Sequence, residues 1–253
     1  MSDQFTYKIF RKFDQELGNL WISFEKNKNY FFYKKIKYIK NLINLSESSD
    51  ILIVVIYNKS LPIILCPLEI KKLYGIKILQ WIGTTESDYC APILSNSSTL
   101  NEITFNKLWK RILGEIRYYD LILFKKQPEY VEKNLNPFVS YLKNFFQSKV
   151  YQINLNGDME DYLKSIKNKK FLSEFKRTEK KLFLDFEVKF EHFTKYQNDL
   201  KPSDFIKQKK LTLEKKKIKN DLNEKLMNLH DRTYKKLEEN YMLTVLKING
   251  EKI

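Results

Sequence analysis

The chain has 253 residues, of which 43% are hydrophobic and 15% aromatic, a composition typical of folded globular proteins rather than disordered chains. Its longest apolar runs, Ile51–Tyr57 and Leu61–Leu68, are far shorter than the roughly 20 residues of a membrane-spanning helix. Residues 1–10 contain no apolar stretch of signal-peptide length. These features argue against an exported or membrane-spanning protein, and we expect a soluble, cytoplasmic one.

The two cysteines and two histidines form no pattern typical of a disulfide framework or a metal site. Cys66 and Cys90 are not in a CxxC spacing, and His192 and His230 are isolated. A metal centre needs several such ligands at short spacings. We therefore expect neither a metal site nor a disulfide framework.

A net charge of +15 indicates either a nucleic-acid partner or lysine-rich solvated surfaces. Five arginines stand against 41 lysines, and Asn, Ile, Phe and Tyr are also abundant. This mixture is typical of an AT-rich genome, whereas dedicated nucleic-acid sites usually also use arginine for two-pronged contacts. The charge alone therefore favours solvated surfaces over nucleic acid as the main partner.

Apolar spacing and turn residues predict the elements of the first 155 residues. Asp14 is an expected helix cap, and Ile103 is expected on the inward face of its helix. The expected elements are, in chain order, a strand at Thr6–Phe10, helices at Asp14–Lys26 and Tyr30–Leu45, strands at Ile51–Tyr57, Leu61–Lys71 and Ile76–Ile82, a helix at Thr99–Tyr118, a strand at Asp120–Lys125, a helix at Leu135–Phe146 and a strand at Lys149–Leu155. This order predicts an α+β domain with a mixed sheet flanked by helices.

The remaining residues predict further helices and strands. The stretch 194–219 is lysine-rich and contains Pro202, so it is either a loop or a loosely held helix. The other expected elements are helices at Asp158–Ile166, Asn168–Leu184 and Asp221–Asn240 and strands at Phe186–Phe193 and Met242–Ile248.

Asn249-Gly250 is a strong signal for a two-residue hairpin turn, yet only three residues follow it. A typical returning strand has about five residues. Either the second domain is truncated, or a short returning strand lies at the edge of its sheet.

The segment WIGTTESDYCAPIL at Trp81–Leu94, together with the order of elements, resembles the GNAT-like acetyltransferases associated with cellulose biosynthesis, relatives of the Fem-type aminoacyltransferases. In that family, a strand ends in an aromatic residue and Gly and is followed by a Ser-Asp-Tyr element. The matching residues here are Trp81, Gly83, Ser87, Asp88 and Tyr89. Further similarities, each weak alone but in the family's order, are ILCPLEIKK at Ile64–Lys72, YQINL at Tyr151–Leu155, the basic segment Asp161–Leu182 and LHDRTYKKL at Leu229–Leu237.

The resemblance implies two GNAT-like domains, the first at residues 1–155 and an incomplete second one at 156–253. It also implies acetyl-CoA or another acyl-CoA as co-substrate, no tightly bound cofactor, and an amine or hydroxyl acceptor related to the cell envelope or to polysaccharide. The glycine-rich loop with which GNAT enzymes hold the CoA pyrophosphate is not recognisable, because no two of the six glycines are close enough together.

Acyl transfer to an amine needs a base for the amine proton and donors that polarise the acyl carbonyl. Asp88 follows a strand end, where it is a candidate base or substrate anchor; alternatively it satisfies backbone N–H groups of its loop. Tyr89 is a candidate proton donor or a packed aromatic residue. Trp81 and Ser87 are candidates for contacting the substrate.

The basic helix supplies candidate donor-binding cations at Lys170, Lys176 and Arg177, either for CoA phosphates or for a tRNA. Charge runs on helices are, alternatively, ordinary solvated faces. Arg232 is a further candidate for donor binding, while His230, two residues away, lies on a different helix face.

Three functions remain open from the sequence. The first is an acyltransferase of GNAT-like fold. The second is a scaffold that kept the fold without catalysis, as the missing phosphate loop would suggest. The third is a basic RNA- or tRNA-associated module.

Overall fold

The computed structural model describes residues 4–26, 32–45, 49–95, 100–145, 157–166, 168–197, 199–220, 222–237 and 241–252. These residues form two compact units. The first comprises Met1–Asn144 and Asp199–Asn240, and the second Phe145–Asn198 and Tyr241–Ile253. Within the described ranges, no helix is both long enough and apolar enough to cross a membrane.

The first unit is an α+β domain built on a six-stranded mixed sheet with the strand order β1-β2-β3-β4-β6, in which β5 pairs with β3. Strands β1 to β4 pair in antiparallel fashion, and β4 and β6 pair in parallel. Its strands are β1 (Phe5–Phe10), β2 (Ser49–Asn58), β3 (Leu61–Leu73), β4 (Ile76–Trp81), β5 (Ile93–Leu94) and β6 (Leu121–Ile122), and the hairpin β7 (Tyr130–Val131) and β8 (Asn134–Leu135) lies apart from this sheet.

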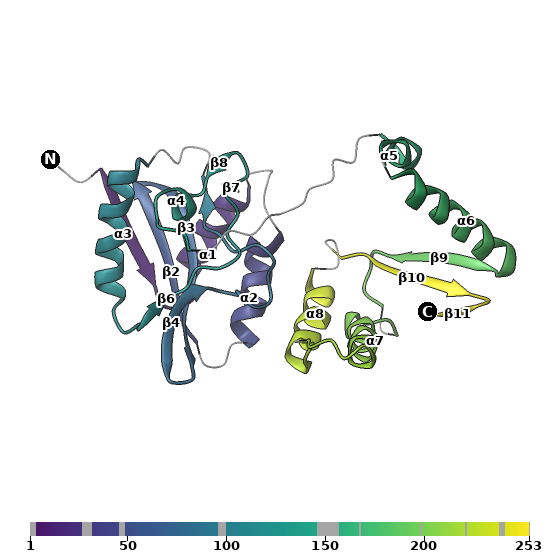
Figure 1. Cartoon of the computed structure of the whole chain (residues 1–253). Coiled ribbons are helices and arrows are strands. Elements are labelled where there is room, and N and C mark those ends of the chain that lie inside the picture. The colour runs from purple at the N-terminus through teal and green to yellow at the C-terminus, as the bar shows by residue number, and fades with distance from the viewer. Residues whose placement is uncertain are drawn as a thin grey trace. The chain divides into compact units, whose positions relative to one another are not determined.

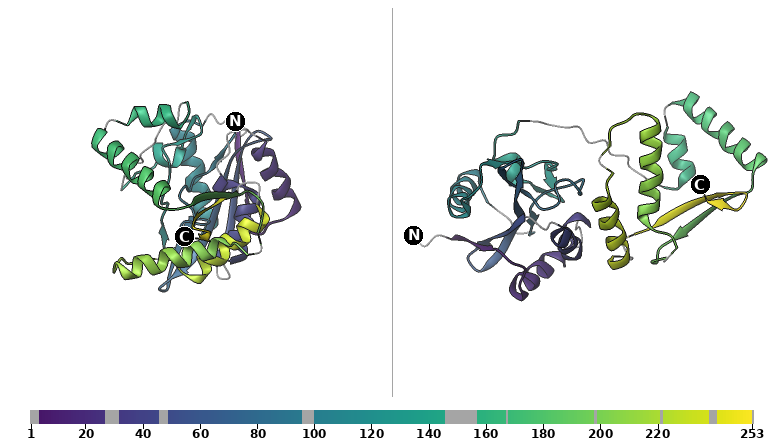
Figure 2. Two further views of the ribbon diagram at one scale, coloured as in Figure 1. Left: turned by 90° about the vertical axis from the view of Figure 1, so that its right-hand side faces the viewer. Right: turned by 90° about the horizontal axis from the view of Figure 1, so that it is seen from below.

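Helices cover both faces of this sheet (Figure 1, Figure 2). Side chains alternate along a strand, so Val54 of β2 belongs to one core and Val55 to the other. The first core contains residues of α3 and α4, and the second contains residues of α1, α2 and α8. The helices of this unit are α1 (Gln15–Glu25), the 3-10 helix η1 (Phe32–Lys34), α2 (Ile36–Leu45), α3 (Glu102–Ile116), α4 (Pro137–Ser140), α7 (Pro202–Lys215) and α8 (Glu224–Lys236).

The second unit holds a three-stranded antiparallel sheet of β9 (Val188–Phe193), β10 (Leu243–Ile248) and β11 (Glu251–Lys252), together with α5 (Met159–Ser165) and α6 (Lys169–Asp185). Asn249 and Gly250 form the predicted turn between β10 and β11, both with positive φ. A two-residue hairpin turn of this kind requires that conformation, which Asn and Gly adopt readily. Asp158 caps α5 and Asn168 caps α6 by accepting a backbone N–H, and no residue of either helix is buried.

The described boundary between the units differs from the predicted one, because α7 and α8 belong to the first unit and not to a second domain at 156–253. The physical reason is burial: Leu229 of α8 and Leu237, its C-terminal cap, lie in the core that α1 and α2 share with the sheet. The backbone N–H of Ser203 in α7 donates to Asp231 of α8 at 2.9 Å, which joins the two helices. The lysine-rich stretch 194–219 therefore contains a helix rather than only a loop.

Three local predictions need correction. The helix expected at Tyr30–Leu45 is divided within its described part into η1 and α2, because Trp21 Nε1 donates to the carbonyl of Lys34 and takes that acceptor from the helix. The helix expected at Leu135–Phe146 contains only α4 among its described residues. Ile103 is 81% exposed, since Phe105 occupies the inward position of α3. The strand expected at Lys149–Leu155 lies outside the described residues.

Candidate functional site

The loop that follows β4 is the centre of the candidate site. In open sheets, ligands bind beyond the carboxyl ends of parallel strands, and β4, which pairs in parallel with β6, ends at Trp81. The loop is rigidly tied: Ser87 N donates to the Gly83 carbonyl at 2.8 Å, and Cys90 N donates to the Lys126 carbonyl at 3.0 Å. Lys126 Nζ also donates to the carbonyl of Ser87 at 2.8 Å.

Gly83 brings this loop against α2. Its φ is +77°, and a Cβ atom there would lie 2.5 Å from Leu42 Cδ1 and 3.0 Å from Ser87 Oγ. Both the backbone conformation and the contact therefore require glycine. The close approach allows α2, the loop and the sheet to enclose one small cavity.

Replacing Gly83 by alanine is expected to destabilise the first unit by about 2–3 kcal/mol, through strain at positive φ and overpacking against Leu42. Urea unfolding followed by tryptophan fluorescence measures this. Gly114→Ala is the matched control: nothing lies within 4 Å of its Cβ position in α3, so it is expected to stabilise slightly. Equal shifts in both variants would contradict the prediction.

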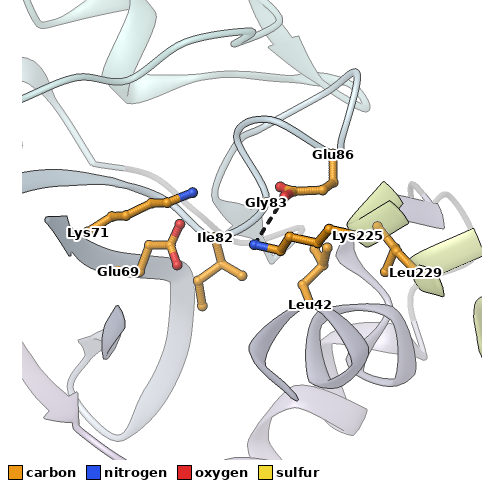
Figure 3. Close-up of a pocket in the computed structure, with 8 residues that line it drawn as sticks. All are labelled: Leu42, Glu69, Lys71, Ile82, Gly83, Glu86, Lys225 and Leu229. Atoms are coloured by element: carbon orange, nitrogen blue, oxygen red, sulfur yellow. Dashed lines mark ion pairs between the residues drawn. The ribbon is translucent and has the colours of Figure 1, made fainter. Parts of the chain in front are cut away.

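The cavity has a volume of about 10 Å³ and is lined by charged and apolar side chains from four elements (Figure 3). The lining residues are Leu42 of α2, Glu69 and Lys71 of β3, Ile82, Gly83 and Glu86 of the loop, and Lys225 and Leu229 of α8. In Figure 3 the four charged side chains extend toward the same space. All of these residues belong to the first unit.

Glu69 is the most deeply placed charged group at this cavity. It is only 5% exposed, and Gln80, its direct neighbour on β4, donates from Nε2 to Glu69 Oε1 at 2.8 Å. A buried carboxylate is costly unless it is hydrogen-bonded, so the Gln80 amide both stabilises and orients it. Glu69 and Lys71 alternate onto the same sheet face as Leu65, where the apolar core ends and polar residues begin.

Glu86 and Lys225 form the outer part of the cavity. Lys225 Nζ lies 3.9 Å from Glu86 Oε1, and the side chains are 44% and 15% exposed respectively. A partly exposed pair at this distance contributes little to stability. The backbone of Glu86 is held more firmly, since its carbonyl accepts from Tyr38 of α2 at 3.2 Å and its N–H donates to the Gly83 carbonyl at 3.1 Å.

A second polar cluster lies around η1 and the same loop. Asp88 is exposed and accepts from the Tyr33 hydroxyl at 3.1 Å; burial and the Asp88 charge raise the pKa of Tyr33 to about 12. Lys34 is 3% exposed, and its Nζ donates to the Pro92 carbonyl at 2.8 Å. Burial lowers the pKa of Lys34 to about 7, while the carboxylate of Glu132 acts in the opposite direction. This lysine is therefore the most strongly perturbed described cation near the loop.

The predicted site residues lie in different environments. Ser87 is 2% exposed, and its Oγ has no hydrogen-bond partner in the described structure. Tyr89 is half-buried on the same loop as Ser87 and Asp88. Trp81 is 1% exposed and packs against Phe124 and Phe138, so its side chain belongs to the core and has almost no surface for a ligand.

The predicted cations are spread over both units. Lys170, Lys176 and Arg177 are exposed on α6 in the second unit, whereas Arg232 is exposed on α8 in the first. His230 is half-buried, and burial lowers its pKa. In the described ranges no three His, Cys, Asp or Glu side chains gather as metal ligands do.

Comparison with known proteins identifies no relative: no family model, no curated protein and no solved structure matches this chain.

Proposed function

We propose that the first unit is an acyltransferase of GNAT-like fold that transfers an acyl group from a CoA-type donor to an amine at the Glu69 cavity. The observation that carries the proposal is a buried, oriented carboxylate beside a cavity at the carboxyl end of a sheet strand. The order of strand, helices, antiparallel meander, helix and parallel strand supports it, because the sequence resemblance to this family rests on the same order.

In this proposal Glu69 accepts the proton of the attacking amine. The amine nitrogen forms a bond to the acyl carbon, the thioester C–S bond breaks, and CoA leaves as a thiolate. The thiolate takes up a proton from water, and Glu69 returns its proton to water. A general base must lie within hydrogen-bonding reach of the proton it accepts. Glu69 meets that requirement for an amine in the cavity, whereas Asp88 is exposed and does not line the cavity. We therefore prefer Glu69 to Asp88 as the base.

The direct test is stabilisation of the protein by acetyl-CoA together with release of free CoA thiol in the presence of amine acceptors. A ligand that binds only the folded state raises its stability, so thermal unfolding with and without acetyl-CoA reports binding. The absence of both a shift and thiol release would contradict the proposal and would favour a scaffold with a retained fold.

The variant Glu69→Gln is expected to lower the rate of thiol release about 100-fold. The glutamine amide has the same shape as the carboxylate but cannot accept the proton. Asp88→Asn is the matched comparison and is expected to change the rate far less. If Asp88→Asn lowers the rate of thiol release more than Glu69→Gln does, Asp88 and not Glu69 is the base. Unfolding curves of both variants check that each is folded.

A further inference from the structure

The Glu69 cavity carries two charges of each sign. Glu69 and Glu86 supply carboxylates, and Lys71 and Lys225 supply ammonium groups, each pair drawn from two different elements. A ligand with a single charge would meet two like charges as well as two opposite ones, and like charges placed together are strongly unfavourable. A ligand that bears both an ammonium and a carboxylate group can pair with all four.

The two carboxylates are held more firmly than the two ammonium groups. Glu69 lies within β3, paired with β2 and β4, and Gln80 fixes its orientation. Lys71 is half-buried near the end of β3, and Lys225 is exposed in the first turn of α8. Thr85 Oγ1 donates to Glu86 Oε2 at 2.9 Å, so the second carboxylate is also oriented. Two oriented carboxylates, with Glu69 at the inner end, and long, adaptable lysines suit a ligand whose ammonium group enters first.

The size of the cavity agrees with this orientation. Its volume of about 10 Å³ is about that needed for one water molecule. An ammonium group has that size, whereas a carboxylate or phosphate does not. The carboxylate of the ligand would then remain at the mouth, where the weak Lys225–Glu86 pair at 3.9 Å can open at little cost.

The remaining lining is apolar. Leu42, Ile82 and Leu229 are buried and lie around the charged groups (Figure 3). Leu229 follows Lys225 by four residues, so both side chains lie on one face of α8. With exposed fractions of 5%, 4% and 1%, Leu42, Ile82 and Leu229 form the floor of the cavity and leave the ligand's own side chain outside it.

We propose that this cavity binds a free α-amino acid, with the α-ammonium group at Glu69 and Glu86 and the α-carboxylate at Lys71 and Lys225. As the acceptor of the transfer proposed above, this ligand rests on the proposed function, and the product would be its N-acyl derivative. Binding of the amino acid itself needs no acyl donor.

The test uses calorimetry on the full chain with three probes: L-leucine, L-leucinamide and N-acetyl-L-leucine. The amide lacks the carboxylate, and the acetyl derivative lacks the ammonium group. We expect L-leucine to bind and each of the other two to bind at least about tenfold more weakly, a loss of about one charge-paired contact. Equal affinity for L-leucinamide, equal affinity for N-acetyl-L-leucine, or no binding of L-leucine would each overturn the proposal.

Variants assign the two ends of the ligand. Glu69→Gln is expected to weaken the binding of L-leucine and to leave the already weak binding of N-acetyl-L-leucine unchanged. Lys225→Ala is expected to weaken the binding of L-leucine and to leave the already weak binding of L-leucinamide unchanged. Lys72→Ala is the control, because this exposed lysine alternates with Lys71 onto the other face of β3. If Lys72→Ala weakens binding as much as Lys225→Ala, general surface charge and not this cavity is responsible.

The two proposals fail in different ways. Binding of L-leucine without any acetyl-CoA binding or thiol release would retain the amino-acid site and reject the acyltransferase. Thiol release with other amines, but without L-leucine binding, would retain the acyltransferase and reject the amino acid as its acceptor.

Discussion

The first unit is expected to become more stable as the pH rises from about 7 to about 8.5, and Lys34→Met is expected to remove most of this dependence. Burial lowers the pKa of Lys34 to about 7, whereas an exposed lysine has a pKa of 10.5. Between these values the unfolded chain holds a proton that the folded chain lacks. The free energy of unfolding therefore rises with pH, by up to about 1.4 kcal/mol per pH unit.

The pH window is set by the other buried groups. Burial raises the pKa of the Cys90 thiol to about 12 and also raises that of Cys66, both from 9.0. These thiols keep their protons in the folded state above about pH 9, so their contribution falls with rising pH. His230 has a pKa below its usual 6.5 and acts on the acidic side. Lys34 therefore dominates between about pH 7 and 8.5.

Tryptophan fluorescence during urea unfolding isolates this effect. All three tryptophans, Trp21, Trp81 and Trp109, belong to the first unit, so the signal does not report the second. The control is Lys37→Met, which removes an exposed lysine from α2 and is expected to keep the wild-type slope. Equal slopes for wild type and Lys34→Met would contradict the burial of the Lys34 amine.

Elements set by local chemistry were predictable from the sequence. Asp14 and Asp158 cap their helices, and Asn249-Gly250 forms the last hairpin turn. Each of these features depends on residues within about four positions of each other. The long strands β2 and β3 were equally clear, because their apolar residues and the Asn58–Ser60 turn are local signals.

Features that depend on distant contacts were not predictable. The apolar stripe of α8 was visible, but the surface against which Leu229 packs includes α2 residues such as Leu42, far away in the sequence. The periodicity of apolar residues predicts that a helix has a buried side, but it does not indicate which surface covers that side. The predicted domain boundary consequently placed α8 in the second domain.

The candidate site shows the same division. Asp88 drew attention because it follows a strand end, yet the cavity is built around Glu69, which lies within an otherwise apolar strand. The available signal was the alternation of Glu69 and Lys71 on one face of β3, with Gln80 opposite Glu69 on β4. Lys225 could not be added from the sequence, because its place depends on the packing of α8.

Phe138→Ala is expected to be the most destabilising of the single substitutions that only remove side-chain volume, at about 3–5 kcal/mol. Phe138 is 1% exposed, and its ring contacts those of Trp81, Phe105, Trp109 and Phe124, with centroids 4.8 to 5.6 Å apart. Its removal leaves a cavity between α3 and the end of the sheet and also loses the edge-to-face ring pairs. Domains of this size have a free energy of unfolding of about 5–15 kcal/mol, so this substitution removes a large part of it.

The short helix α4 explains why the surroundings will not collapse to fill that cavity. Asn136, fully buried, accepts the N–H of Phe138 at 3.1 Å and donates to the Pro128 carbonyl at 3.0 Å, so the backbone is held in place. The control Ile103→Ala removes a side chain from α3 that is 81% exposed and is expected to change the stability by less than about 0.5 kcal/mol. Fluorescence-detected urea unfolding measures both variants, and a cost for Phe138→Ala no larger than that for Ile103→Ala would mean that this aromatic cluster is not the core of the first unit.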